Sequence, residues 1–255
     1  EMQRIFRLIK DKAEKLLADG TVNRVIGWKN GEFFYDQTPA IFSAEDKLEG
    51  FVYDSFCASN LSKYLINESK KHGKILALLK PCDTYSYNQL LKEHRINNDN
   101  VYILGIECRG MIDINKIKDL GIKGIIKVEE KGDKLVFQTI YGEKTCKRSK
   151  VLLEKCLCCK SKQHVVYDEL VTSGEDTQEN TYENTHENIP EIESNRFELV
   201  EKLEAMTPDE RFSFWRSELS KCIRCNACRN VCPACSCVKC VFDNDNSGVA
   251  SKANT

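Results

Sequence analysis

The length, composition and charge of the chain exclude several classes of protein. At 255 residues, it is long enough for one medium-sized domain and a small module. With 38 Lys and Arg against 39 Asp and Glu, it lacks the basic surface of a nucleic-acid-binding protein. No apolar run approaches the roughly 20 residues that span a bilayer, and the charged start lacks a signal-peptide core, so we expect a cytoplasmic protein that is not membrane-embedded.

The N-terminal part of the chain predicts a helix followed by a hairpin. Apolar residues recur at helical spacing over residues 3–19, and Gly20 is positioned to end the helix. Residues 24–35 predict two strands joined by the turn Asn30-Gly31, a dipeptide that favours tight hairpins. We expect Trp28 to be a partly buried aromatic residue of this hairpin.

The next stretch predicts an extended segment and two helices. Residues 39–42 form the extended segment, and Ser43 is expected to cap the first helix. The second helix is predicted over residues 54–71, where apolar residues gather on one side. Cys57 lies in it and is interpreted as a small buried apolar residue.

A strand–helix–strand pattern then points to a βαβ crossover. The buried strands are predicted over residues 74–79 and 100–106, so Cys82 and Cys108 follow them at the same edge of a parallel sheet. If the strands are neighbours, their ends lie about 5 Å apart, close enough for both thiols to reach one cluster. The alternative is a pair of free buried cysteines. A second hairpin, predicted over residues 124–140, would close the same sheet.

Cys156 and Cys159 form a Cys-x2-Cys pair after the helical turns predicted over residues 149–155. This pair is two thiols short of a cluster, and the two thiols at the predicted sheet edge can supply the rest. The predicted ligands of a first [4Fe-4S] cluster are therefore Cys82, Cys108, Cys156 and Cys159. Cys146 and Cys158 are interpreted as bystanders.

The composition changes abruptly after residue 170. Residues 171–195 contain no Lys or Arg, and this acidic, low-complexity stretch predicts a tether or a strap on a partner. Thr207 and Glu210 then form a capping box around Pro208, followed by apolar residues that predict a docking surface. The predicted division is an α/β domain over residues 1–170, the linker over 171–195, a helical and ferredoxin-like module over 196–241 and a tail over 242–255.

Seven cysteines lie within residues 222–240. The spacing over residues 222–233 is Cys-x2-Cys-x2-Cys-x3-Cys-Pro, which bacterial-type ferredoxins use to bind an iron–sulfur cluster. Zinc is the alternative, but a zinc site normally needs a second, separated pair and no third cysteine in the same register. The candidate ligands are Cys222, Cys225, Cys228, Cys232, Cys235, Cys237 and Cys240.

These seven thiols can be shared in two ways. Two [4Fe-4S] clusters need eight thiolates, so the first three cysteines would bind one cluster and Cys232 would join the last three in the second. The fourth ligand of the first of these clusters would come from Cys158, from a residue beyond Thr255 or from a partner subunit. Alternatively, the first four cysteines bind one cluster, and the last three are unused or form part of a zinc site. Because Glu1 precedes Met2, we expect that the chain does not begin at its natural initiator.

Three short motifs resemble the beta-subunit family of deazaflavin-coenzyme hydrogenases and dehydrogenases, which includes formate dehydrogenase beta subunits. The motifs are Lys80-Pro-Cys82-Asp, Gly105-Ile-Glu-Cys108 and Cys156-Leu-Cys-Cys159 followed by Tyr167-Asp168. The likeness covers residues 20–170, and members of this family also carry an appended ferredoxin-like stretch. It implies an α/β core with a [4Fe-4S] cluster on the four cysteines named above, and often FAD. Residues 1–20 lack the glycine-rich start of flavin-binding members, which argues against FAD.

The main functional prediction is an electron-transfer subunit of an anaerobic oxidoreductase complex of the hydrogenase or formate dehydrogenase type. It would contain two or three [4Fe-4S] clusters and no catalytic residues of its own. The expected partners are catalytic or flavin-bearing subunits in a hetero-oligomer, with ferredoxin as a candidate soluble carrier. The first alternative is a subunit that itself reduces or oxidises a soluble carrier at FAD, and the second is a structural zinc module for assembly.

Overall fold

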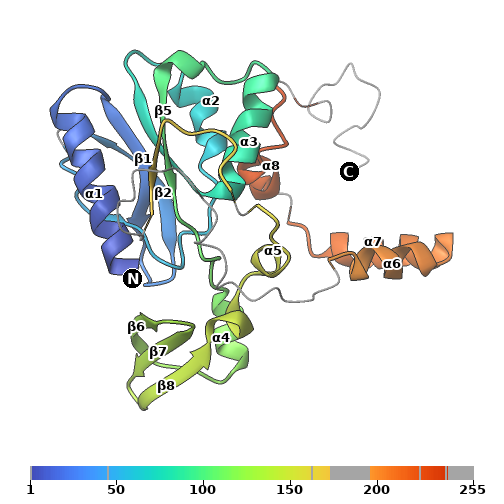
Figure 1. The fold of residues 1–255 in the computed structure, drawn as a ribbon. Coiled ribbons are helices and arrows are strands. Elements are labelled where there is room, and N and C mark those ends of the chain that lie inside the picture. The colour runs from blue at the N-terminus through green and yellow to red at the C-terminus, as the bar shows by residue number, and fades with distance from the viewer. Residues whose placement is uncertain are drawn as a thin grey trace.

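The structure is a computed structural model that describes residues 2–172 and 196–240, except residues 45, 162, 224 and 239. The described chain has the predicted mixed α/β architecture (Figure 1). Only the first two residues of the predicted linker fall within the described part, and the predicted tail over residues 242–255 lies outside it. None of the described helices is both long enough and apolar enough to cross a membrane.

A mixed sheet of six strands forms the centre of the molecule (Figure 1). The strands are β1 (Arg24–Asn30), β2 (Gln37–Ser43), β3 (Phe51–Val52), β4 (Ile75–Leu79), β5 (Val101–Ile106) and β9 (Glu169–Val171). Their order is β2-β1-β4-β5-β9, and β3 also pairs with β1. The pairs β1–β4, β4–β5 and β5–β9 are parallel, whereas β2 and β3 run antiparallel to β1.

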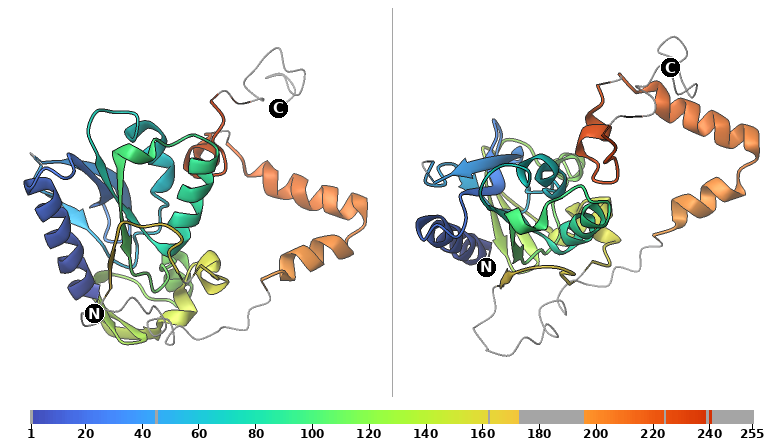
Figure 2. Two further views of the ribbon diagram at one scale, coloured as in Figure 1. Left: turned by 45° about the horizontal axis from the view of Figure 1, so that its top comes forward. Right: turned by 90° about the horizontal axis from the view of Figure 1, so that it is seen from above.

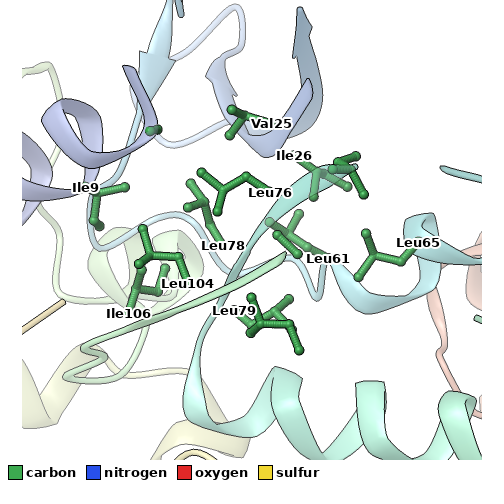
Figure 3. Close-up of a cluster of buried hydrophobic side chains, with 14 of the residues drawn as sticks. Ile9, Val25, Ile26, Leu61, Leu65, Leu76, Leu78, Leu79, Leu104 and Ile106 are labelled. Atoms are coloured by element: carbon green, nitrogen blue, oxygen red, sulfur yellow. The ribbon is translucent and has the colours of Figure 1, made fainter. Parts of the chain in front are cut away.

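Helices cover both faces of this sheet (Figure 2). They are α1 (Met2–Ala18) on one face, and α2 (Leu65–Glu68) and α3 (Pro81–Lys92) on the other. The buried stripe of α1 has apolar residues at intervals of three or four, namely Ile5, Ile9, Ala13 and Leu16. Every residue of β4 is buried, as expected for a parallel strand covered on both faces. Figure 3 shows the resulting core, with Leu76 of β4 and Leu104 of β5 among its members.

The predicted βαβ crossover is confirmed. β4 and β5 are parallel neighbours, and α3 and the short 3-10 helix η2 (Asn98–Asn100) connect them. Pro81 occupies the first position of α3, where the N–H that proline lacks is not needed for helical hydrogen bonding. Asp83 accepts a hydrogen bond from the backbone N–H of Lys80 at 3.3 Å, which satisfies a donor at the start of the helix.

The second predicted hairpin is present but does not close the main sheet. It belongs to a separate three-stranded antiparallel sheet of β6 (Ile125–Lys131), β7 (Lys134–Thr139) and β8 (Gly142–Lys147). Leu135 and Phe137 of β7 pack with Ile117 of α4 (Ile114–Asp119) in a second core, and this packing draws the hairpin away from the main sheet. The strand next to β5 is instead β9. After β8 come η3 (Arg148–Val151) and α5 (Glu154–Leu157), which confirm the predicted helical turns.

The N-terminal hairpin has a longer turn than predicted. Asn30 pairs with Gln37, so residues 31–36 form the loop and the second strand comes later in the chain. Phe34 lies in this loop and packs against the second core. The side-chain amide of Gln37 donates a hydrogen bond to the carbonyl oxygen of Phe34 at 3.0 Å. Gly31 is still required, because a Cβ there would lie 2.0 Å from the carbonyl oxygen of Asp36.

The two helices predicted after this hairpin are largely wrong. Ser43 ends β2, and its N–H and hydroxyl both donate hydrogen bonds to Asp46, at 2.6 and 2.7 Å, in a turn. The predicted helix over residues 54–71 is reduced to α2 and the short η1 (Ser62–Tyr64). The carboxylate of Asp54 accepts a hydrogen bond from the N–H two residues later at 2.8 Å, and such local bonds compete with helix formation.

Three helices make up the described C-terminal part: α6 (Glu198–Ala205), α7 (Pro208–Ser220) and α8 (Ala227–Val231). The predicted capping box is confirmed, since the N–H of Thr207 donates to the Glu210 carboxylate at 2.8 Å and the N–H of Glu210 donates to the Thr207 hydroxyl at 3.4 Å. α6 and α7 extend away from the main body, whereas α8 lies beside α3 (Figure 2). The apolar side chains of Phe212, Trp215 and Leu219 on α7 are exposed.

Candidate metal centres

The carboxyl edge of the main sheet brings Cys82 and Cys108 to equivalent positions. Leu79, the last residue of β4, is paired with Gly105 of β5. Cys82 and Cys108 each follow this pair by three residues (82 − 79 and 108 − 105). Because the two strands are parallel and adjacent, both thiols leave the sheet at one edge, as predicted.

The four predicted ligands of the first cluster are electrostatic neighbours. Burial raises the pKa of the Cys82 thiol, and the nearby charges of Asp83, Cys108 and Cys159 raise it further. Burial raises the pKa of Cys108 to about 11, and Cys156 adds to the increase. Burial also raises the pKa of Cys156, with Cys159 again contributing. These contributions place the four predicted ligands in one electrostatic neighbourhood.

The described residues do not form a finished metal site. No group of three or more Cys, His, Asp or Glu side chains in the described ranges converges closely enough to hold a metal ion. Cys82 and Cys108 lie at one sheet edge and interact electrostatically with Cys159 and Cys156, which fits the ligand set of a four-cysteine cluster.

Two consecutive backbone amides bind the sulfurs of two predicted ligands. The N–H of Met111 donates to the sulfur of Cys156 at 3.3 Å, and the N–H of Gly110 forms a hydrogen bond that lowers the pKa of Cys108. Gly110 has a φ of +87°, and a Cβ there would lie 2.9 Å from a methyl carbon of Leu152, so the loop requires glycine. Hydrogen bonds to ligand sulfurs stabilise thiolates and set cluster potentials.

Arg148 fixes the loop that carries these amides. Its buried guanidinium donates to the carbonyl oxygens of Arg109 and Gly110, at 3.2 and 2.6 Å, and pairs with the carboxylate of Glu130 at 2.8 Å. Ser55 also donates a hydrogen bond to Glu130. The burial of Arg148 was not predicted, because a single arginine among lysines at the start of a short helical turn carries no signal for burial.

Lys80 is a buried cation at the start of α3. Its side chain is 2% exposed, and its ammonium lies 2.9 Å from a carboxylate oxygen of Asp83 and 2.9 Å from the carbonyl oxygen of Ser59. The ammonium also lies 4.3 Å from the ring centroid of Trp28. Trp28 was predicted to be partly buried, but it is fully buried beneath this charge.

The charge of Lys80 acts on three of the predicted ligands. It lowers the pKa values of Cys82, Cys108 and Cys156, so it favours their thiolate forms. Burial lowers the pKa of Lys80, but Asp83 and the thiols of Cys82 and Cys108 raise it, so the pKa of Lys80 lies above its ordinary value. Lys80 belongs to one of the motifs that carry the family resemblance, but this role was not predicted from the sequence.

The predicted bystanders differ in their surroundings. Cys57 is fully buried, as predicted, and its thiol interacts with Asp54 and the carbonyl of Val52 at 3.7 and 3.8 Å. Cys146 lies on β8 and packs against the second core. Cys158 is half-buried at the end of α5, between two predicted ligands.

The C-terminal cysteines form a second, exposed group. Cys235 and Cys240 are half-buried, and the other five candidate ligands are exposed. The described residues of α8 include no buried side chain, so an apolar core does not hold this segment in shape. Asn226 has a left-handed backbone (φ +60°) directly before α8, a conformation that can direct successive N–H groups at an anion, as in many iron–sulfur sites. The choice between one and two clusters here stays a prediction.

Comparisons with known proteins identify relatives along most of the chain. No family model matches the sequence. The F420-dependent formate dehydrogenase subunit beta of Methanocaldococcus jannaschii is 25% identical over 282 aligned residues, which cover 93% of this chain and 73% of that protein. The F420-dependent formate dehydrogenase 1 subunit beta of Methanococcus maripaludis is 24% identical over 278 residues, with 90% and 72% covered.

One solved structure gives a further comparison. A chain of the F420-reducing [NiFe] hydrogenase complex from Methanosarcina barkeri has a TM-score of 0.49 and 15% identity, with 59% of this chain and 58% of that chain covered. The family resemblance predicted from the motifs is confirmed by the two curated relatives. Over at least 90% of its length, the chain is related to the beta subunits of F420-dependent formate dehydrogenases.

Proposed function

We propose that this chain is an iron–sulfur electron-transfer subunit of an oxidoreductase complex, which relays electrons between a catalytic subunit and another redox partner. The placement of Cys82 and Cys108 at the carboxyl edge of a parallel sheet carries this proposal, together with the hydrogen bond from the N–H of Met111, in the loop after β5, to the sulfur of Cys156. The relatives support it, because both are named as subunits of a dehydrogenase.

The proposed clusters occupy two parts of the chain. In the α/β domain over residues 1–170, Cys82, Cys108, Cys156 and Cys159 would bind one [4Fe-4S] cluster. In the module over residues 196–241, Cys222 to Cys240 would supply the ligands of one or two more, and the linker over residues 171–195 would join the parts. A bound cluster would supply one-electron chemistry. The chain's own amides and Lys80 would stabilise the sulfurs, without catalysing a reaction on a substrate.

The proposed partners are the other subunits of such a complex. The relatives are beta subunits, so we expect this chain to bind a catalytic subunit in a hetero-oligomer. The exposed apolar side chains of α7 fit a surface that such a subunit would cover. A cytoplasmic location and ferredoxin as a carrier stay predictions from the sequence.

A second candidate function is a subunit that itself reduces or oxidises a soluble carrier at FAD. The names of the relatives favour it, because both proteins are described as F420-dependent. In that case, FAD would be released in a stoichiometric amount from the purified complex. The absence of FAD from the purified complex would favour the main proposal, an electron-transfer subunit without a flavin.

Metal and sulfide analysis tests the main proposal. We expect protein purified without oxygen to be brown and to contain iron and acid-labile sulfide in nearly equal amounts, since a cubane cluster has as many sulfides as irons. Zinc without sulfide would contradict the proposal and would favour the structural zinc module.

A further inference from the structure

Lys63 connects the C-terminal cysteine segment to the α/β domain. Its half-buried side chain extends from η1, and its ammonium donates hydrogen bonds to the carbonyl oxygens of Arg229, Cys232 and Cys235, with distances of 2.8 Å to the last two. The hydroxyl of Ser236 adds a hydrogen bond to the carboxylate of Glu93, directly after α3. The partners in these contacts are at least 143 residues apart in the sequence.

The three carbonyl groups match the hydrogen-bonding capacity of a lysine. An ammonium has three donors and no acceptor, so the segment uses all the donors of Lys63. Arg229 lies in α8, and Cys232 directly follows the last residue of this helix. The last carbonyls of a helix lack partners within the helix and carry its negative dipole end, which favours a cation there. Lys63 therefore recognises the backbone shape of the segment and not its side chains.

This shape depends on the same residues that we propose as cluster ligands. The three carbonyls converge on one ammonium only when residues 229–235 are folded, and Cys232 and Cys235 each contribute a carbonyl to Lys63 and a thiol to a proposed cluster. The described residues of α8 have no buried side chain, so we expect bound metal to contribute, beside the contact with Lys63, to keeping the segment folded.

We propose that Lys63 docks the C-terminal cysteine module onto α3 and η1, and that docking and cluster binding in this module stabilise each other. The second clause rests on the proposed function, whereas the first does not. Two processes that require one folded shape are thermodynamically coupled, and the coupling acts equally in both directions. Weaker docking should therefore loosen the metal, and metal removal should loosen the docking.

Hydrogen–deuterium exchange on the full chain, purified without oxygen, tests this proposal. Lys63→Met removes all three donors but keeps most of the aliphatic stem, and Lys63→Arg keeps the charge and donors. Lys92→Met, on an exposed residue of α3, is the matched control. We expect Lys63→Met to speed exchange of amides in residues 227–237 by about tenfold or more, with little change in Lys92→Met and partial recovery in Lys63→Arg.

Two further readouts separate docking from folding and from metal content. Amides of β4 should keep their wild-type exchange in all variants, which would show that the α/β domain is folded. Iron release from the C-terminal module to a chelator should be about tenfold faster in Lys63→Met. Wild-type exchange of residues 227–237 in Lys63→Met would overturn docking, and unchanged iron release would overturn the coupling. A module purified without iron would refute the proposed function there, while the exchange comparison would still decide docking.

Discussion

At the scale of single residues, Lys80 and Asp83 form a buried ion pair beside the predicted ligands of the first cluster. Both side chains are at most 2% exposed, so water cannot stabilise either charge if its partner is removed. The pair lies against Trp28, and the ammonium has a second acceptor in the carbonyl of Ser59. A buried ion pair adds less to stability than the short distance between its charges suggests, because both charges lose their hydration. Removing one partner, however, leaves an uncompensated buried charge.

We predict that Lys80→Met lowers the free energy of unfolding by about 3–5 kcal/mol, because the carboxylate of Asp83 then remains buried without its partner. Lys80→Met combined with Asp83→Asn should lose less, since no buried charge is left. Denaturant unfolding of the three proteins measures the difference. A loss below about 1 kcal/mol in Lys80→Met would show that solvent reaches Asp83.

Substitution by serine should lower the iron content at the proposed ligands but not at the bystander cysteines. We predict that serine at Cys82, Cys108, Cys156 or Cys159 lowers the iron content of the purified chain, because each change weakens a bond on which the folded site depends. Serine at Cys57 or Cys146 should leave the iron content unchanged. A full cluster signal in Cys82→Ser would refute the argument from the sheet edge.

At the scale of structural elements, the loop after β5 combines two demands. It must present the amides of Gly110 and Met111 to two different sulfurs, and it must pass close to Leu152. The left-handed conformation of Gly110 satisfies both demands. Arg148 holds the same loop in place by donating a hydrogen bond to the carbonyl oxygen of Gly110. The loop is therefore positioned from outside by the first residue of η3, directly after the second sheet.

Gly110→Ala and Gly121→Ala form a matched pair that tests this loop. Both glycines have a positive φ, but a Cβ would lie 2.9 Å from Leu152 at position 110 and would meet nothing within 4 Å at position 121. We predict that Gly121→Ala costs about 1–2 kcal/mol of stability and keeps the iron, whereas Gly110→Ala costs more and loses iron from the first cluster. Unfolding and iron analysis of both variants measure this, and equal iron contents would contradict a role for the loop.

The elements that could be predicted from the sequence are those with a local signal. The βαβ crossover was predicted because β4 and β5 are apolar runs on either side of a helical pattern. The length of the turn after Asn30 was not predicted, because it depends on Phe34, which packs against a core formed by residues distant in the sequence. The burial of Lys80 and Arg148 could not be predicted either, since each depends on partners that only the tertiary fold supplies.

At the scale of the whole molecule, the two cysteine groups are held by different means. The first lies at the edge of a sheet with an extensive apolar core, and the second lies on a segment with no buried side chain in its described helix. We therefore expect the two groups to respond differently to metal removal. The α/β domain should keep its fold, and the C-terminal module should lose its own.

The number of clusters in the C-terminal module can be counted in the full chain. With Cys82→Ser and Cys156→Ser removing the first cluster, about four remaining irons, unaffected by Cys237→Ser, would indicate a single cluster. About eight irons, or a loss on that substitution, would indicate two clusters, because Cys237 is a cluster ligand only in the two-cluster arrangement. Iron content after purification without oxygen is the measurement.

The position of α3 between the two groups has a consequence for their angular relation. Cys82 is the second residue of this helix, and Glu93, which Ser236 contacts, directly follows its last residue. Eleven residues separate them (93 − 82), which corresponds to about three full turns and a rise of about 16 Å. The two positions therefore lie on nearly the same side of α3. One inserted residue would rotate them apart by about 100°, so the length of α3 sets their phase as well as their spacing.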